Sequence, residues 1–96
     1  MKKIYLSGKI SGLENYKEKF AEAAVKARDL FDEEVEILNP AELPIVGKEW
    51  ADFMIRDLMF LKDCDAIVML DNWEYSVGAN VEHFFAKGCG IEIYYL

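Results

Sequence analysis

The sequence contains little cysteine and little histidine, which limits the metal chemistry that it can perform. Its 96 residues include 2 cysteines and 1 histidine, and no CxxC, HExxH or paired-histidine spacing occurs. A structural zinc site needs about four such ligands at short spacing, so we expect none. Two cysteines far apart, Cys64 and Cys89, are typical of buried free thiols. Neither a metal nor an organic cofactor is predicted.

Long apolar runs and an excess of positive charge are also missing. No run approaches the roughly 18 apolar residues of a membrane span, and the first apolar run is too short for a signal-peptide core. The chain carries 11 Lys and Arg against 18 Asp and Glu, without the basic stripe that a nucleic acid polymer requires. We therefore expect a cytoplasmic protein that binds neither a membrane nor such a polymer. A small anionic ligand held by backbone amides stays compatible with this composition.

The apolar pattern predicts strands that alternate with helices. A hydrophobic share of 53% excludes disorder, and the length fits a single domain over residues 1–96. Strands are expected at 3–6, 35–38, 66–70 and 91–95, and helices at about 16–31, 49–62 and 76–87. Asn15 is a candidate cap of the first helix, and Gly88 and Gly90 are expected to end the last.

This order of elements predicts an α/β fold. We expect a doubly wound, flavodoxin- or Rossmann-like parallel sheet of about four strands in the order 2-1-3-4, with helices on both faces. Ligands bind to such a sheet beyond the carboxyl ends of the strands at the switch point, here the first and third. The segments 7–12 and 71–82 follow those strands, and the site is therefore predicted there.

The first of these segments, Ser7 to Gly12, contains two glycines and two serines. Such a loop lets backbone amides approach a ligand closely, although it matches neither the Walker nor the dinucleotide-binding pattern. An ordinary connection between a strand and a helix is the alternative. Lys9 within the loop would contact a phosphate or lie in solvent.

An aspartate, Asp57, falls on the apolar stripe of the second helix. It lies four residues after Phe53 and four before Leu61, so its carboxylate shares their face. A charge there costs several kcal/mol unless it is paired, hydrogen-bonded or facing a pocket. Asp57 is therefore either a structural partner of a neighbour such as Arg56 or an acid aimed into a cleft.

The second segment places a glutamate inside the third helix. Ser76 is a plausible N-cap, which would direct its hydroxyl and free amides at the mouth of the cleft. Glu82 leans toward Gly78, one turn earlier, where the missing side chain would leave a slot for a ring. The alternative is a solvated Glu82 and a glycine that only permits close packing.

Aromatic residues beside this segment allow two interpretations. Trp73 and Tyr75 would stack on a base, or anchor the loop or an interface. His83 points about 100° away from Glu82 around the helix, and we expect it at the surface or in an interface.

Taken together, these residues resemble the nucleoside 2-deoxyribosyltransferase superfamily, which includes the 2'-deoxynucleoside 5'-phosphate N-hydrolases. The sequence looks closest to the small members found in bacteria and phages, and the resemblance extends over nearly the whole chain. It is carried by five segments in the right order: Ile4–Gly12, Asn39–Leu43, Arg56–Leu58, Cys64–Val68 and the pattern Ser76-x-Gly78-x-x-x-Glu82.

The resemblance implies a role for each matching residue. The glycosyl-accepting glutamate of the family corresponds to Glu82, its supporting aspartate to Asp57 and its first-strand tyrosine to Tyr5. Ser76 matches the serine that binds a phosphate or the 5' end of the sugar. The remaining predicted substrate-binding residues are Gly8, Lys9, Ser11, Asn39, Trp73 and Gly78.

One departure from the family pattern concerns the first loop. Ser11 stands where similar nucleotide hydrolases carry an arginine, so the need for a 5'-phosphate stays open. The resemblance also implies a homodimer or larger homo-oligomer, in which a neighbouring subunit closes the site.

The sequence thus predicts cleavage or transfer at the N-glycosidic bond of a 2'-deoxynucleoside or its 5'-monophosphate. Two carboxylic acids in different surroundings suit a reaction with an oxocarbenium-like transition state. Water as the acceptor makes such an enzyme a hydrolase, and a second base makes it a transferase. The alternatives are a sensor of a nucleotide or ADP-ribose-like ligand, and an interaction protein, for which a filled pocket around Glu82 would be evidence.

Overall fold

The computed structural model of the protein describes residues 1–44 and 46–96. Its strands are β1 (Lys2–Ser7), β2 (Val35–Leu38), β3 (Ala66–Met69) and β4 (Glu92–Tyr95). Its helices are α1 (Tyr16–Asp29), α2 (Trp50–Leu61) and α3 (Val77–Cys89), and two short 3-10 turns, η1 (Pro40–Glu42) and η2 (Trp73–Tyr75), lie in the connections. The predicted alternation of strands and helices is confirmed.

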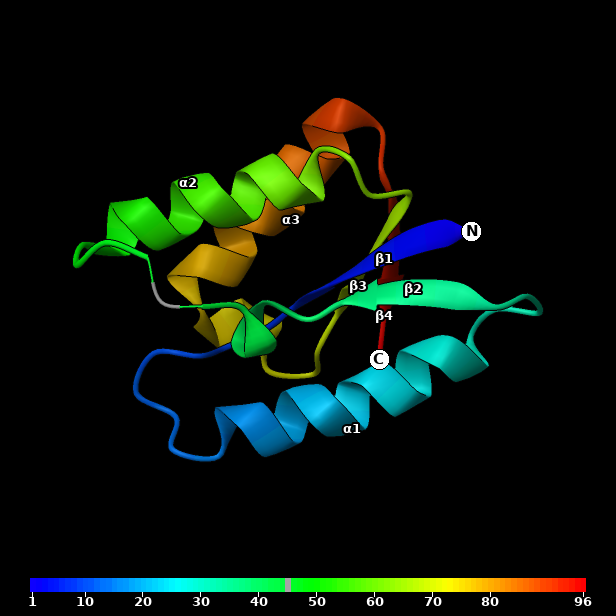
Figure 1. The fold of residues 1–96 in the computed structure, drawn as a ribbon, viewed down its shortest axis with the longest axis horizontal. Coiled ribbons are helices and arrows are strands. Elements are labelled where there is room, and N and C mark those ends of the chain that lie inside the picture. Colours follow the sequence, from blue (N-terminus) through cyan, green and yellow to red (C-terminus); the bar gives the residue numbers. More distant parts are fainter. Residues whose placement is uncertain (45) are drawn as a thin grey trace.

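The strands form a parallel sheet in the order β2-β1-β3-β4. Helix α1 covers one face, and α2 and α3 lie side by side over the other (Figure 1). The predicted α/β fold and the strand order 2-1-3-4 are therefore confirmed. The switch point lies between β1 and β3, which pair from Ile4 with Ala66 to Ser7 with Met69.

Two apolar cores follow from the alternation of side chains along the central strands. Ile4 and Leu6 pack toward α1, whereas Tyr5 packs with the residues of α2 and α3. The same alternation separates Val68 from Met69 on β3. Ser7 lies two residues after Tyr5, so β1 presents both hydroxyls to the layer of α2 and α3.

Several local predictions need correction. Asn15 precedes α1, but its side chain makes no capping hydrogen bond. Helix α3 continues through Gly88 to Cys89 and ends at Gly90, whose φ of 73° is readily adopted by glycine. Cys64 is buried as expected, whereas Cys89 is exposed. Within the two described ranges, no helix is both long and apolar enough to cross a membrane.

Candidate active site

Glu82 is held by two hydroxyl groups of β1. The Tyr5 hydroxyl donates a hydrogen bond to Glu82 Oε2 at 2.5 Å, and the Ser7 hydroxyl donates one to Oε1 at 2.6 Å. Glu82 is only 5% exposed. The alternative of a solvated Glu82 on the helix surface is therefore wrong. Both carboxylate oxygens thus have a partner on the central strand.

Burial dominates the protonation of this cluster. Loss of solvent raises the pKa of Glu82 from 4.5 to about 7, a rise opposed by the hydrogen bonds from Ser7 and Tyr5 and assisted by the charge of Asp57. Burial, followed by the charge of Glu82, also raises the pKa of Tyr5. The phenol therefore stays protonated and acts as a donor, while Glu82 changes charge near neutral pH.

Asp57 combines the two interpretations that its position suggested. Its Oδ1 accepts a hydrogen bond from Arg56 Nε at 2.9 Å and lies 2.9 Å from Arg56 Nη2. Burial raises the pKa of Asp57, and the hydrogen bond and charge of Arg56 oppose that rise. The aspartate is 7% exposed and lines a cavity, so it is both ion-paired and directed at a cleft.

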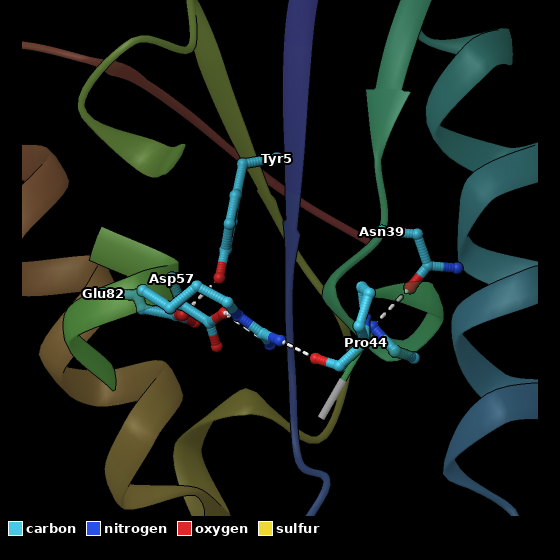
Figure 2. Close-up of polar contacts among 7 residues, drawn as sticks. Tyr5, Asn39, Pro44, Asp57 and Glu82 are labelled. Carbon is cyan, nitrogen blue, oxygen red and sulfur yellow. Dashed lines mark hydrogen bonds and ion pairs between the residues drawn. The ribbon is translucent and has the colours of Figure 1, made fainter. Parts of the chain in front are cut away.

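Arg56 also ties Asp57 to the connection that follows β2. Its Nη1 donates a hydrogen bond to the carbonyl of Pro44, and its guanidinium lies 5.6 Å from the centre of the Phe53 ring. Figure 2 shows Tyr5 reaching from the sheet toward Glu82 and Asp57, with Pro44 opposite them. The site is therefore assembled from β1, α2, α3 and this connection.

A cavity of about 690 Å³ opens beside the two carboxylates. It has the size expected for a small-molecule site. Side chains do not fill it, so the filled pocket around Glu82 that would favour an interaction protein is not observed. Most of the predicted site residues line it: Gly8, Lys9, Ser11, Asp57, Ser76, Gly78 and Glu82. Its apolar wall includes residues that sequence reasoning did not propose: Ile10, Tyr16, Leu43, Trp50, Phe53 and Met54.

Ser76 caps α3 as predicted. Its Oγ accepts a hydrogen bond from the backbone amide of Ala79 at 3.1 Å. Lys9 lines the cavity, and its Nζ is 3.4 Å from the carbonyl oxygen of Tyr75, at the limit of a hydrogen bond. Its backbone amide donates to Asn72 Oδ1 at 3.0 Å, which joins the connections that follow β1 and β3.

The two predicted glycines permit close packing as well as lining the cavity. A Cβ at Gly8 would lie 2.8 Å from Leu70 Cβ, so this glycine lets the end of β1 approach the end of β3. A Cβ at Gly78 would lie 3.2 Å from Met54 Sδ and 4.0 Å from Trp50 Nε1. The space above Gly78 is thus partly occupied by α2, and the slot expected for a ring is narrower than predicted.

Three predicted residues are not among those that line the cavity. Tyr5 lies behind Glu82 and is fully buried. Asn39 caps η1, because its Oδ1 accepts a hydrogen bond from the Ala41 amide at 3.0 Å, and Figure 2 shows it on the far side of β1 from Glu82. Trp73 stacks on His83 at 4.4 Å between ring centres, as a residue that anchors the loop does.

Ser7 and Arg56 are the polar partners that the predicted site set omitted. Ser7 is fully buried, and its position two residues after Tyr5 was the available signal. A hydroxyl within a buried strand needs a hydrogen-bond partner, and the two-residue period places that partner on the side of Tyr5. Arg56 had been considered as a partner of Asp57 but not as a residue of the cavity wall.

Comparison with protein families matches residues 2–95 to the family described as "Domain of unknown function (DUF4406)". The chain belongs to this family. A comparison with curated protein sequences gives no match. Within the described residues of this DUF4406 protein, no group of three or more His, Cys, Asp or Glu side chains has an arrangement that suits a metal ion.

Among solved structures, the DUF4406 chain is similar to a 2-desoxiribosyltransferase from Leishmania mexicana. The TM-score is 0.72 at 17% sequence identity. The match covers 100% of this chain and 64% of the other, so the chain spans less than two thirds of that protein's length. At this identity the likeness shows a shared fold, and it confirms at that level the resemblance drawn from the motifs.

Proposed function

We propose that this protein cleaves, or transfers from, the N-glycosidic bond of a 2'-deoxynucleoside or its 5'-monophosphate. The observation that carries the proposal is the pair of buried carboxylates, Glu82 and Asp57, on the wall of one open cavity. The fold shared with a 2-desoxiribosyltransferase supports the choice of substrate class. Glu82 is the proposed nucleophile, Asp57 its acidic partner and Tyr5 the donor that holds Glu82.

The reaction proceeds in two steps. An ionised oxygen of Glu82 attacks C1' of the sugar while the bond from C1' to the base nitrogen breaks, and its electron pair leaves with the base. The departing base takes up a proton, which Asp57 supplies in the fraction of molecules where its carboxyl is protonated beside Arg56; burial raises the pKa of Asp57 and enlarges that fraction. A water molecule or the nitrogen of a second base then attacks C1', the bond from C1' to Glu82 breaks to restore the Glu82 carboxylate, and the attacking group gives up its proton to the carboxylate of Asp57.

The polarity of the cavity agrees with a nucleoside. Tyr16, Trp50 and Phe53 provide flat apolar surfaces for a base, and Ser11 and Ser76 provide hydroxyls for a sugar or phosphate. Lys9 adds a cation to the lining. These groups line the same cavity as the two carboxylates, which supports a substrate whose bond between base and sugar lies near Glu82.

Release of the free base tests this proposal. The wild type and Glu82→Gln are incubated with the common deoxynucleosides and their 5'-monophosphates, with and without a second base, and the bases are separated by chromatography. Glu92→Gln, an exposed glutamate on β4, is the matched control. We expect release by the wild type and the control alone, and an active Glu82→Gln would rule out the nucleophile. Ligand binding by calorimetry without any product would instead favour a sensor.

We also propose that two copies of the chain associate through α2 and α3. Large apolar side chains are exposed along both helices: Ile55, Met59, Val77, Val81 and Phe84. Val77, at 72% exposed, also lines the cavity, so the apolar surface continues into the site. In a symmetric dimer the same surface of both copies meets. A second copy packed on α2 and α3 would cover the apolar side chains and narrow the opening of the cavity.

A further inference from the structure

The two hydrogen bonds to Glu82 come from the same strand and reach different oxygens. Tyr5 and Ser7 are two residues apart on β1 and therefore point to the same face of the sheet. Their hydroxyls reach Oε2 and Oε1 at 2.5 Å and 2.6 Å. Neither residue lines the cavity, whereas Glu82 does. The donors thus hold the carboxylate from behind, and its open side faces the cavity.

Both donors are neutral, which distinguishes Glu82 from Asp57. Asp57 has the cation of Arg56 at 2.9 Å, whereas no cation lies within ion-pair distance of Glu82 among the described residues. The groups that face Glu82 are the Tyr5 phenol from β1 and the Asp57 carboxylate from α2. Arg56 and Lys9 complete the charges on the cavity wall. The ionised form of Glu82 therefore depends mainly on the two hydroxyls.

We propose that Ser7 is a positioning residue of this site: through its hydrogen bond to Oε1 it fixes the Glu82 carboxylate and favours its ionised form. Tyr5 alone would hold one oxygen and leave the other without a donor. With both oxygens held, the face of Glu82 toward the cavity is constant. The catalytic consequence of this inference rests on the proposed function. The effect of Ser7 on the position and charge of Glu82 is independent of it.

The pKa of Glu82 tests the inference without any substrate. It is measured by NMR on isotope-labelled glutamate carboxyl carbons, with Glu82→Gln identifying the signal. We expect about 7 in the wild type and a value higher by about one in Ser7→Ala, the effect of losing one hydrogen bond to a carboxylate. Ser7→Thr keeps the hydroxyl and should return the pKa toward the wild-type value.

A packing control separates positioning from general disturbance of the core. Met69 pairs with Ser7 in the sheet register and is fully buried in the same layer, so Met69→Leu disturbs that layer and keeps both hydroxyl donors of Glu82. This variant should leave the pKa of Glu82 unchanged. Where Ser7→Ala does not fold, Ser7→Cys, with its weaker donor, should raise the pKa in the same direction. An unchanged pKa in the folded variant overturns the inference.

The rate of base release gives the catalytic part of the test. With a pKa higher by about one, the ionised fraction of Glu82 at pH 7 falls from about a half to about a tenth. Ser7→Ala should then be about five-fold slower than the wild type in kcat at pH 7, and near about pH 9 it should approach the rate of the wild type measured at the same pH. If Ser7→Ala raises the pKa of Glu82 but the wild type releases no base, the proposed function is overturned and the role of Ser7 stands. If the wild type is active and Ser7→Ala has the same pH profile, the role of Ser7 alone is overturned.

Discussion

Arg56 and Asp57 are neighbours in sequence that form a buried ion pair through a single carboxylate oxygen. Arg56 Nε and Nη2 both lie 2.9 Å from Asp57 Oδ1. The remaining nitrogen, Nη1, donates to the carbonyl of Pro44. One guanidinium therefore neutralises an acid of the site and joins it to the connection that follows β2.

Arg56→Ala should destabilise the protein most at alkaline pH. Without the cation, Asp57 is a buried charge without a counterion, which costs about 3 kcal/mol. The cost disappears in acid, because Asp57 is then protonated in both the folded and the unfolded state. Chemical unfolding at several pH values measures this dependence. Arg28→Ala, which removes an exposed arginine from α1, should show little change, and an equal loss at every pH would contradict the assigned role of the pair.

Glu82→Gln should make the protein more stable at pH 8 and have little effect in acid. The pKa of Glu82 is raised from 4.5 to about 7 by folding, so the folded state holds a proton that the unfolded state has lost. The contribution of Glu82 to the free energy of unfolding is therefore fully present below about pH 4.5. It falls by about 3 kcal/mol in total as the pH rises to about 7. Glutamine is neutral throughout and avoids this loss.

Thermal unfolding of the wild type, Glu82→Gln and Glu92→Gln at low and high pH checks this prediction. The difference between wild type and Glu82→Gln should grow through the window from about 4.5 to about 7, whereas Glu92→Gln should follow the wild type. A Glu82→Gln protein that is less stable than the wild type at pH 8 would show that Glu82 is ionised at a lower pH than its burial indicates.

Two glycine substitutions should change stability in opposite directions. Gly8→Ala places a Cβ 2.8 Å from Leu70 Cβ and 2.9 Å from Leu70 Cδ2, so β1 and β3 must separate at a cost of about 1–3 kcal/mol. Gly88 lies inside α3 with no atom near an added Cβ, so Gly88→Ala should stabilise by about 0.5–1 kcal/mol. Midpoints of denaturant unfolding measure both effects, and the same sign for both would contradict the packing described for Gly8.

Phe84→Glu should prevent association of two chains. Phe84 is 79% exposed on α3, and a carboxylate there would be buried against a second copy of a chain with a net charge of −7. Light scattering after size exclusion should give the mass of two chains for the wild type and of one for the variant. Val25→Glu is the control, since Val25 is an exposed apolar residue on α1, across the sheet. A wild type with the mass of one chain would rule out the dimer.

The fold was predictable because its signals are local and repeated. The apolar run Ala66–Met69 is buried on both faces, as a central parallel strand requires, and the alternation of elements leaves few topologies. Glu82 and Asp57 were identifiable for a related reason. Each is a charge on a helix face that packs against the sheet, and such a charge needs a partner or a pocket.

The partners of the site residues were harder to predict, because they depend on how the elements approach one another. The position of Trp73 in the sequence is compatible with stacking on a ligand, but the proximity of α3 makes His83 its partner. The distance between Gly78 and Met54 likewise depends on the packing of α2 on α3. Asn39 before Pro40 is a local signal for the start of η1, although Asn39 was predicted as a substrate-binding residue and not as a cap.

The two walls of the cavity differ in the kind of backbone that forms them. Glu82 and its donors belong to a helix and to a strand that is paired on both sides, while Ala41 and Leu43 belong to a short turn and the residues after it. Substitutions in that turn change the shape that a ligand meets without moving the carboxylate or its hydroxyls. On the proposed function, divergence in this turn would change which ligand a related chain accepts and keep Glu82 and its donors, and comparison of these turns would sort such chains by ligand.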